Sequence, residues 1–160
     1  VKAQGTKSPD YAVGGGSGHT APFRDDYNAP AFELTKIYPD DVYDKGAQYY
    51  GSGYKELDTE AMSILKKIKG KPDAEVTIYR AVPKGKGIKD FNKGDWVTLT
   101  KGYAKEHGES NLNGKYDILS KKVKADEVFT DANSLQEFGY DPRGLDKSQL
   151  TDIWNKANKK

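Results

Sequence analysis

Apolar residues recur every three or four positions between residues 54 and 69, and this spacing predicts an amphipathic helix. Gly70 follows a lysine-rich last turn, as is typical of a helix C-terminus. A shorter helix is expected between Pro39 and Gly51, because a proline and several acidic residues open that segment. Residues 145–160 predict a terminal amphipathic helix. Its apolar side comprises Leu145, Leu150, Ile153 and Trp154.

The clearest strand pattern lies in residues 76–82, VTIYRAV. Val76, Ile78 and Arg80 share one face of this strand, because successive side chains point to opposite faces. Pro83 ends it. An arginine on an antiparallel strand usually lies on the solvated face. Its position among branched and aromatic residues therefore raises the question of which partners Arg80 has elsewhere in the chain.

Further strands are expected in the second half of the chain. Residues 95–100, DWVTLT, alternate as a strand and are followed by a short helix that Gly108 ends. The remaining strand segments are residues 115–130, which hold one or two strands, and residues 134–141. Helices thus come first and strands mostly later, an order that favours an α+β domain over alternating βαβ units.

Length and composition are typical of a single domain, and the net charge does not indicate which kind of molecule the protein binds. The chain has 160 residues, of which 35% are hydrophobic, and such a length can bury a core. Residues 1–18 are rich in Gly, Ser and Lys without periodicity and predict a flexible arm or linker, so the folded domain is expected over residues 19–160. The formal net charge is only +2 and no third of the chain forms a basic block, so charge alone does not single out nucleic acid.

The missing residue types exclude several kinds of chemistry. There is no cysteine, hence no disulfide framework, thiol nucleophile or thiolate metal site, and two isolated histidines do not make a zinc centre. We therefore expect no metal. No apolar run reaches membrane-spanning length, and the first residues lack the hydrophobic region of a signal peptide. The start without methionine suggests a fragment of something longer.

Three polar features stand on the expected strands: Arg80, the pair Thr98 and Thr100, and Glu137. Taken singly, each has a structural explanation, since threonine favours strands by its shape and a lone glutamate is most often a surface residue. Their order, with about twenty and then about forty residues between them, indicates a function more specifically than any one of them does.

This ordered set resembles the ADP-ribosyltransferase family, in the branch of the cholera and pertussis toxins. In that family a first strand carries an arginine after an aromatic residue, as IYRAV does here. A second strand carries Ser-Thr-Ser before a short helix, to which WVTLTKGYAKEHG is similar, and a later strand carries the catalytic glutamate, to which LQEFGYD is similar. The likeness covers roughly residues 19–143, which also look like domains of phage head-morphogenesis proteins and other large phage or mobile-element polyproteins.

The resemblance implies a split, antiparallel-rich β core with the N-terminal helices packed on it and NAD, as substrate, in a cleft between the central strands. Breaking the nicotinamide–ribose bond leaves an oxocarbenium-like sugar, and a carboxylate such as that of Glu137 stabilises the developing charge. The guanidinium of Arg80 suits the two phosphates of NAD. Thr98 is expected to hydrogen-bond Glu137 or the ribose, which makes these three the expected catalytic residues.

The expected NAD-binding set adds three neighbours to Arg80 and Thr98. Thr100 would support the strand junction, the backbone of Ala81 would hold the nicotinamide amide, and the ring of Trp96 would stack on nicotinamide or pack in the core. The expected partners are NAD and a macromolecular acceptor, either protein or nucleic acid, with no membrane. A toxin or phage polypeptide would bring such a domain to the cytoplasm of a target or host cell.

Two departures from the family pattern keep other functions open. Thr98-Leu99-Thr100 replaces Ser-Thr-Ser but keeps both hydroxyls. Leu135 stands two positions before Glu137, where toxins that modify arginine carry Glu or Gln, so modification of arginine is less expected than another acceptor or NAD hydrolysis. A toxin ribonuclease and a catalytically silent binding domain of a phage structural protein are the remaining alternatives.

Overall fold

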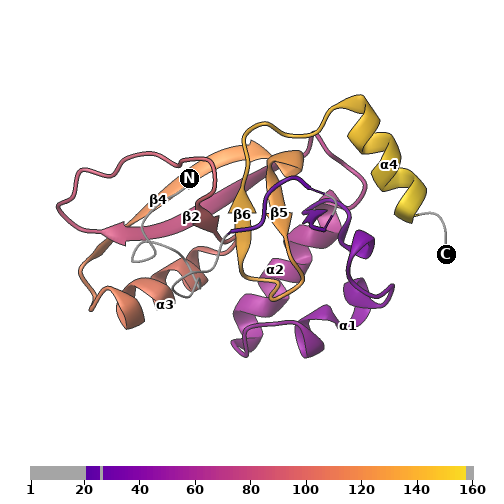
Figure 1. The fold of residues 1–160 in the computed structure, drawn as a ribbon. Helices are drawn as coiled ribbons and strands as arrows, with labels where there is room; N and C mark the ends of the chain where they lie inside the picture. Colours follow the sequence, from indigo (N-terminus) through magenta and orange to yellow (C-terminus); the bar gives the residue numbers. More distant parts are fainter. Residues whose placement is uncertain (1–20, 26, 158–160) are drawn as a thin grey trace.

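The chain folds as an α+β structure, and the computed structural model describes residues 21–25 and 27–157 (Figure 1). Within that range it has four α-helices and two antiparallel sheets, which confirms the expected α+β class. The arm expected in residues 1–18 lies outside the described residues. In chain order the elements are β1 (Ala29–Pro30), η3 (Leu34–Lys36), α1 (Val42–Tyr49), α2 (Lys55–Ile68), β2 (Glu75–Pro83), β3 (Trp96–Val97), α3 (Lys101–Asn111), β4 (Tyr116–Lys124), η4 (Ala125–Glu127), β5 (Val128–Thr130), β6 (Phe138–Tyr140) and α4 (Lys147–Ala157).

Two sheets of unequal size form the β part of the fold. The larger has the strand order β1-β5-β6-β3, and the smaller is the long ribbon of β2 and β4, in which Arg80 pairs with Leu119. An isolated bridge between Tyr79 and Thr98 joins them. In this bridge Tyr79 N donates to Thr98 O over 2.9 Å, and Thr98 N donates to Tyr79 O over 3.0 Å. The β2–β4 ribbon therefore continues into β3 and from there into the larger sheet.

The helices cover these sheets in the way their apolar faces dictate. Helix α2 passes behind β5 and β6 in Figure 1, α1 packs beside α2, and α3 lies along the β2–β4 ribbon. The buried side of α2 is the one that periodicity predicts, including Ala61, Leu65 and Ile68. The main core joins side chains from both sheets and the helices; they include Phe32, Leu34, Met62, Leu65, Ile78, Val97, Leu99, Val128, Leu135 and Phe138.

Several expected boundaries shift in the structure. Helix α3 continues past Gly108 and ends at Asn111. Gly108 does not end the helix; it lies inside it, against the ring of Tyr116. A Cβ at Gly108 would come within 2.4 Å of Cγ of Tyr116. The strand expected over residues 95–100 is regular only at Trp96–Val97.

Strand β6 begins after Glu137, not before it. Leu145 likewise precedes α4 instead of lying within it. Residues 115–130 hold two strands, β4 and β5, separated by η4.

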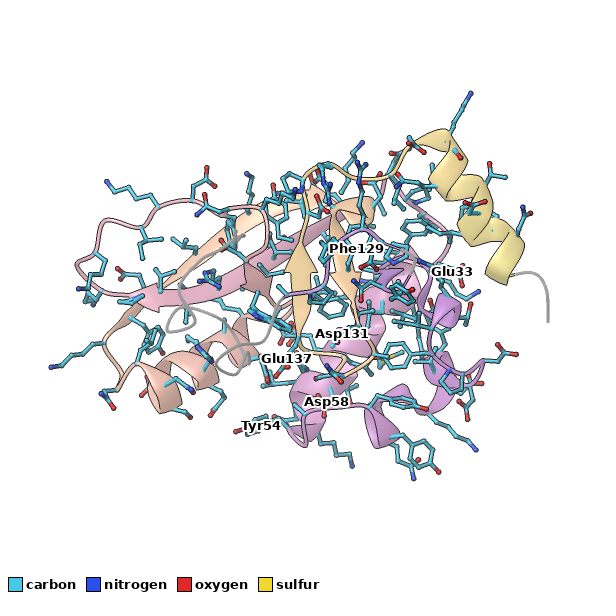
Figure 2. All side chains as sticks on the ribbon, in the orientation of Figure 1. Glu33, Tyr54, Asp58, Phe129, Asp131 and Glu137 are labelled. Atoms are coloured by element: carbon cyan, nitrogen blue, oxygen red, sulfur yellow. The ribbon has the colours of Figure 1, made fainter. Side chains whose placement is uncertain are left out.

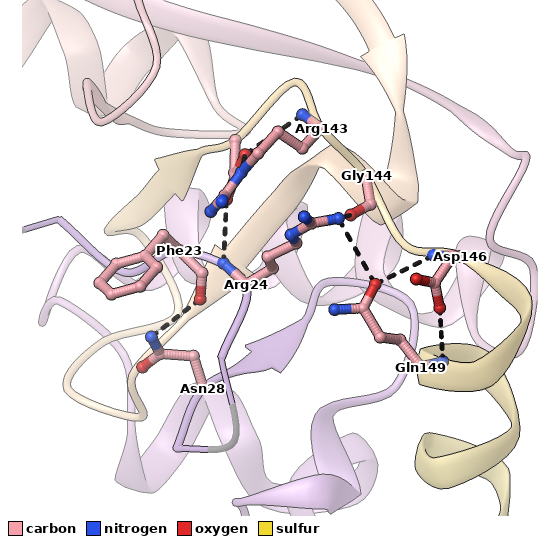
Figure 3. A network of polar contacts seen from close by, with 8 residues as sticks. Phe23, Arg24, Asn28, Arg143, Gly144, Asp146 and Gln149 are labelled. Carbon is pink, nitrogen blue, oxygen red and sulfur yellow. Dashed lines mark hydrogen bonds and ion pairs between the residues drawn. The ribbon is translucent and has the colours of Figure 1, made fainter.

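A polar network ties the segment before β1 to the connection between β6 and α4 (Figure 3). The backbone N–H of Arg24 donates to Asp141 over 3.1 Å, and its guanidinium donates to the carbonyl of Gly144 over 3.2 Å. Arg143 binds the same Asp141 carboxylate through Nε and Nη2. Burial opposes the charge on Asp141, but these hydrogen bonds outweigh it and lower the pKa of its carboxyl.

None of the helices in the described part of the chain is both long enough and apolar enough to cross a membrane.

Candidate functional site

The three segments that carry the predicted site residues lie side by side. Strand β2, with Arg80, meets the segment of Thr98 through the Tyr79–Thr98 bridge. Strand β3 pairs with β6 in the register Trp96 to Gly139 and Val97 to Phe138. Thr98 follows β3 directly and Glu137 directly precedes β6, so the two residues flank the same pair of strands. Segments separated by about twenty and about forty residues in the sequence thus become neighbours in space.

Arg80 is buried, with only 3% of its surface exposed. Its Nη1 donates to the carbonyl of Trp96 over 3.0 Å, and its Nε lies 3.9 Å from the carboxylate of the buried Asp95. The usual explanation for a strand arginine, a solvated face, is therefore wrong for this residue. A buried guanidinium needs both a counter-charge and acceptors, and the segment leading into β3 supplies them.

Thr98 and Thr100 turn their hydroxyls toward one buried amide. Oγ1 of Thr98 donates to Oε1 of Gln136 over 3.2 Å, and Oγ1 of Thr100 donates to the same oxygen over 2.8 Å. Nε2 of Gln136 then donates to Oδ1 of Asp58 over 3.0 Å. Of the two partners expected for Thr98, the structure replaces Glu137 by Gln136, and the contact with the ribose stays a prediction.

Asp58, in the first turn of α2, anchors this buried group. Burial disfavours its charge, but hydrogen bonds from Ser52, Gly53 and Gln136 outweigh burial and lower the pKa of the carboxyl. Figure 2 shows Asp58 and Tyr54 on the same side of the molecule as Glu137. No sequence motif indicates this role for Asp58, because it stands 78 positions from Gln136 and looks like an ordinary acidic residue at a helix start.

Glu137 is half-buried and accepts a hydrogen bond from the hydroxyl of Tyr103, on α3, over 2.7 Å. Burial, followed by this contact with a carboxylate, raises the pKa of the Tyr103 phenol far above its ordinary value. The phenol therefore stays protonated and donates to Glu137. From sequence alone, Tyr103 is a packing residue.

His107 lies one turn after Tyr103 on the same face of α3, four residues along the helix. Burial, and then the positive charge of Arg80, lowers the pKa of its imidazole, so the neutral form is favoured. One face of α3 therefore places the Tyr103 phenol at Glu137 and the His107 imidazole close to Arg80.

The other two residues of the expected NAD-binding set are buried. The ring of Trp96 packs with Ala21 and Tyr103, and Ala81 has no exposed surface. Their roles toward a nicotinamide ring stay predictions. Among residues 21–25 and 27–157, no group of three or more His, Cys, Asp or Glu side chains is arranged to hold a metal ion.

The cluster of Arg80, Tyr103, His107 and Glu137 combines a fixed cation, a neutral imidazole, a protonated phenol and a carboxylate. Such a set can bind an anionic group at one end and stabilise a developing positive charge at the other. Neither the family models nor the curated proteins nor the solved structures compared with this chain match it.

Proposed function

We propose that this protein is a mono-ADP-ribosyltransferase with the fold of that family. In the proposed reaction, the bond between the nicotinamide nitrogen and ribose C1′ breaks, and nicotinamide leaves with the bonding electrons. An oxygen or nitrogen of the acceptor then bonds to C1′ and loses its proton to a base. When the acceptor is water, the same steps amount to NAD hydrolysis.

The adjacency of the three motif segments carries this proposal. The Tyr79–Thr98 bridge and the β3–β6 register bring the strand of Arg80, the threonine segment and Glu137 together in that order. Chance placement of three separate sequence motifs would not favour this arrangement. Polar residues on neighbouring strands that meet at one place are also what a bond-breaking site with a charged substrate requires.

Glu137 has the role of stabilising the oxocarbenium-like ribose. Its carboxylate is held by the Tyr103 hydroxyl, and a carboxylate fixed in advance stabilises a developing charge better than a mobile one. In this proposed reaction, the positive charge of Arg80 binds the phosphates of NAD. Because Arg80 is buried, NAD binding requires the segments around it to move and expose the guanidinium.

The decisive experiment replaces Glu137 by Gln, which keeps the shape and removes the charge. We expect release of nicotinamide from labelled NAD to fall by about a hundred- to a thousandfold, while NAD still binds. Glu60→Gln, an exposed position on α2, is the matched control and should keep full activity. Full activity of Glu137→Gln would refute the role of this carboxylate.

One observation favours a second candidate, a catalytically silent binding domain. Arg80, Thr98 and Thr100 are all buried and hydrogen-bonded to Trp96 or Gln136, as residues of a structural core would be. This candidate predicts that the unaltered protein releases no nicotinamide and does not bind NAD. The same assay therefore separates the two functions.

A further inference from the structure

Two lysine-rich segments that are apart in the sequence lie together in the fold. Residues 84–93 and 115–124 contain eight lysines and two aspartates, whereas the whole chain has a formal net charge of only +2. The rest of the protein therefore carries a net negative charge. The pairing of β2 with β4 joins the two segments: Lys84 N donates to Lys115 O over 3.2 Å, and Lys121 lies 3.5 Å from Asp90.

Most of these lysines are exposed, and we call the exposed ones together the lysine surface. Its exposed members are Lys84, Lys86, Lys89, Lys93, Lys115, Lys122 and Lys124. The eighth, Lys121, is partly buried against Asp90 and the ring of Tyr140. Long ammonium side chains on a ribbon and its connecting loop create a local positive potential that a balanced overall charge conceals.

The lysine surface adjoins the candidate site. Leu119, in β4, is the direct partner of Arg80 in β2, and the loop of residues 84–94 leads from β2 to Asp95, which contacts Arg80. Lys121 lies on the same face of the ribbon as Arg80, two positions along β4 from Leu119, whereas Lys122 and Lys124 lie on the opposite face. The lysines of the loop end at Lys93, two residues before Asp95, so a polymer bound along the loop passes close to the segment that holds Arg80.

We propose that the lysine surface binds nucleic acid through its phosphates and that a nucleic acid is the acceptor of the neighbouring site. The proposed binding of nucleic acid is argued from the charge distribution, whereas the role of nucleic acid as acceptor rests on the proposed function. Repeated phosphates attract spaced lysines without a precise fit. Lysine is depleted in the centre of protein–protein interfaces, which need apolar anchors. Among the residues that the structure describes, the exposed large hydrophobic side chains are Phe23, Tyr27, Tyr49 and Tyr54. All four lie outside the lysine surface, which in that part of the chain therefore lacks the apolar groups that would insert into a membrane.

The test measures binding of a labelled single-stranded RNA of roughly 20 nucleotides by fluorescence anisotropy. We expect the affinity to fall steeply between about 50 and 200 mM salt, because each neutralised phosphate releases counterions. The fourfold variant Lys84→Gln, Lys86→Gln, Lys89→Gln and Lys93→Gln should bind at least about tenfold more weakly. Its salt slope should decrease by about 0.7 for each phosphate that the protein no longer neutralises.

The matched control removes the same charge elsewhere, through Lys45→Gln, Lys66→Gln, Lys67→Gln and Lys71→Gln, all at exposed positions. It should bind RNA as the unaltered protein does. Equal affinities of the two fourfold variants would overturn the proposal. So would an absence of salt-dependent binding, since the lysines would then serve only to keep the edge of β4 that no described strand covers from pairing with other strands. Tighter binding to polyglutamate or to vesicles of anionic lipid than to RNA would also overturn it.

The acceptor role has its own readout. Labelled ADP-ribose should appear on RNA or DNA incubated with NAD and the protein, and it should decrease with the fourfold variant of residues 84–93 while nicotinamide release does not. Label on protein alone would refute a nucleic acid acceptor but leave the transferase. An absence of nicotinamide release by the unaltered protein would refute the transferase, whatever the binding result.

Discussion

Gln136 organises the centre of the candidate site through the two ends of its amide. The carbonyl end accepts from two threonine hydroxyls, and the NH₂ end donates to Asp58. At neutral pH the amide offers an uncharged acceptor and an uncharged donor on one short group, whereas a carboxylate only accepts. All four polar side chains are buried, so each of these hydrogen bonds replaces one that water would otherwise make.

Replacing Gln136 by Glu therefore tests this arrangement. At neutral pH a second carboxylate would face Asp58 in a buried place, and we expect the free energy of unfolding to fall by about 3 kcal/mol. The pKa of the introduced carboxyl would lie above that in the unfolded chain. Lowering the pH protonates it, so the variant should regain stability relative to the unaltered protein.

Gln136→Met is the control for this change, because it has a similar length and introduces no charge. Above about pH 5, where carboxyl groups are ionised, it should destabilise the protein by an amount that does not change with pH, through loss of the hydrogen bonds. Urea unfolding followed by circular dichroism measures both variants. If Gln136→Glu were as stable as the unaltered protein at neutral pH, the contact between Gln136 and Asp58 would be wrong.

His107 makes the stability of the fold depend on pH. Its folded-state pKa lies below the ordinary value of 6.5 through burial and through Arg80. Between the two values the unfolded chain binds more protons, so stability decreases as the pH falls through 6.5 and levels off below the folded pKa. His107→Gln should flatten the stability profile between about pH 7.5 and about pH 5.5, as measured by urea unfolding. An unchanged profile would contradict the neutral, buried imidazole.

At the scale of elements, glycines allow segments to approach more closely than a side chain permits. Gly108 lets α3 pack onto Tyr116 of β4, and Gly139 lets the N-terminal segment cross β6. Helix α3 needs the first contact in order to bring Tyr103 and His107 to the site. The second holds Pro22 and Ala21 over β6 and Trp96.

Gly139→Ala should disrupt that crossing. The added Cβ would lie 1.8 Å from the carbonyl oxygen of Pro22, and backbone does not yield as a flexible side chain would. We expect a loss of about 3 kcal/mol in the free energy of unfolding, together with faster trypsin cleavage after Arg24. Ser120→Ala, at an exposed position on β4, should change neither quantity. An unchanged melting temperature and cleavage rate would contradict the close approach of Pro22.

At the scale of the molecule, the two ends of the described chain support each other. Arg24 binds Gly144, which precedes α4, and Gln149, in the first turn of α4. The ring of Phe32 packs against Trp154 of α4 at 5.6 Å between centroids. The N-terminal segment, which covers Trp96, is therefore fastened at a distance from the candidate site. Contacts at the C-terminal end thus help to keep that cover in place.

Arg24→Ala tests this coupling. Loss of the two side-chain hydrogen bonds should weaken the junction by about 1 kcal/mol and raise amide hydrogen exchange about fivefold in residues 21–30 and 141–150 alike. Helix α3 should exchange as before. Lys55→Ala, at an exposed position, is the control and should leave all three regions unchanged. Faster exchange in only one of the two terminal regions would refute their mutual support.

Local periodicity is sufficient to predict the helices and strands that bury one face. Helix α2 and strand β2 lie where the apolar spacing predicts, because the alternation of apolar and polar residues is itself the consequence of one-sided burial. Periodicity does not predict strand β1, Ala29–Pro30, since two residues have no period and proline is rare in strands. The strand expected at residues 95–100 is cut short because its hydroxyls turn toward Gln136, a partner that no local pattern reveals.

Residue spacing along the chain is sufficient to predict the α+β class, the principal helix and strand, and the order of the motif residues. Their contacts follow from the tertiary structure: Arg80 with Trp96 and Asp95, the threonines with Gln136, and Glu137 with Tyr103. The tertiary structure also brings two separate lysine-rich segments next to each other. The reason is physical, because periodicity records which face of an element is buried, whereas hydrogen bonds and charge clusters depend on how distant segments are brought together.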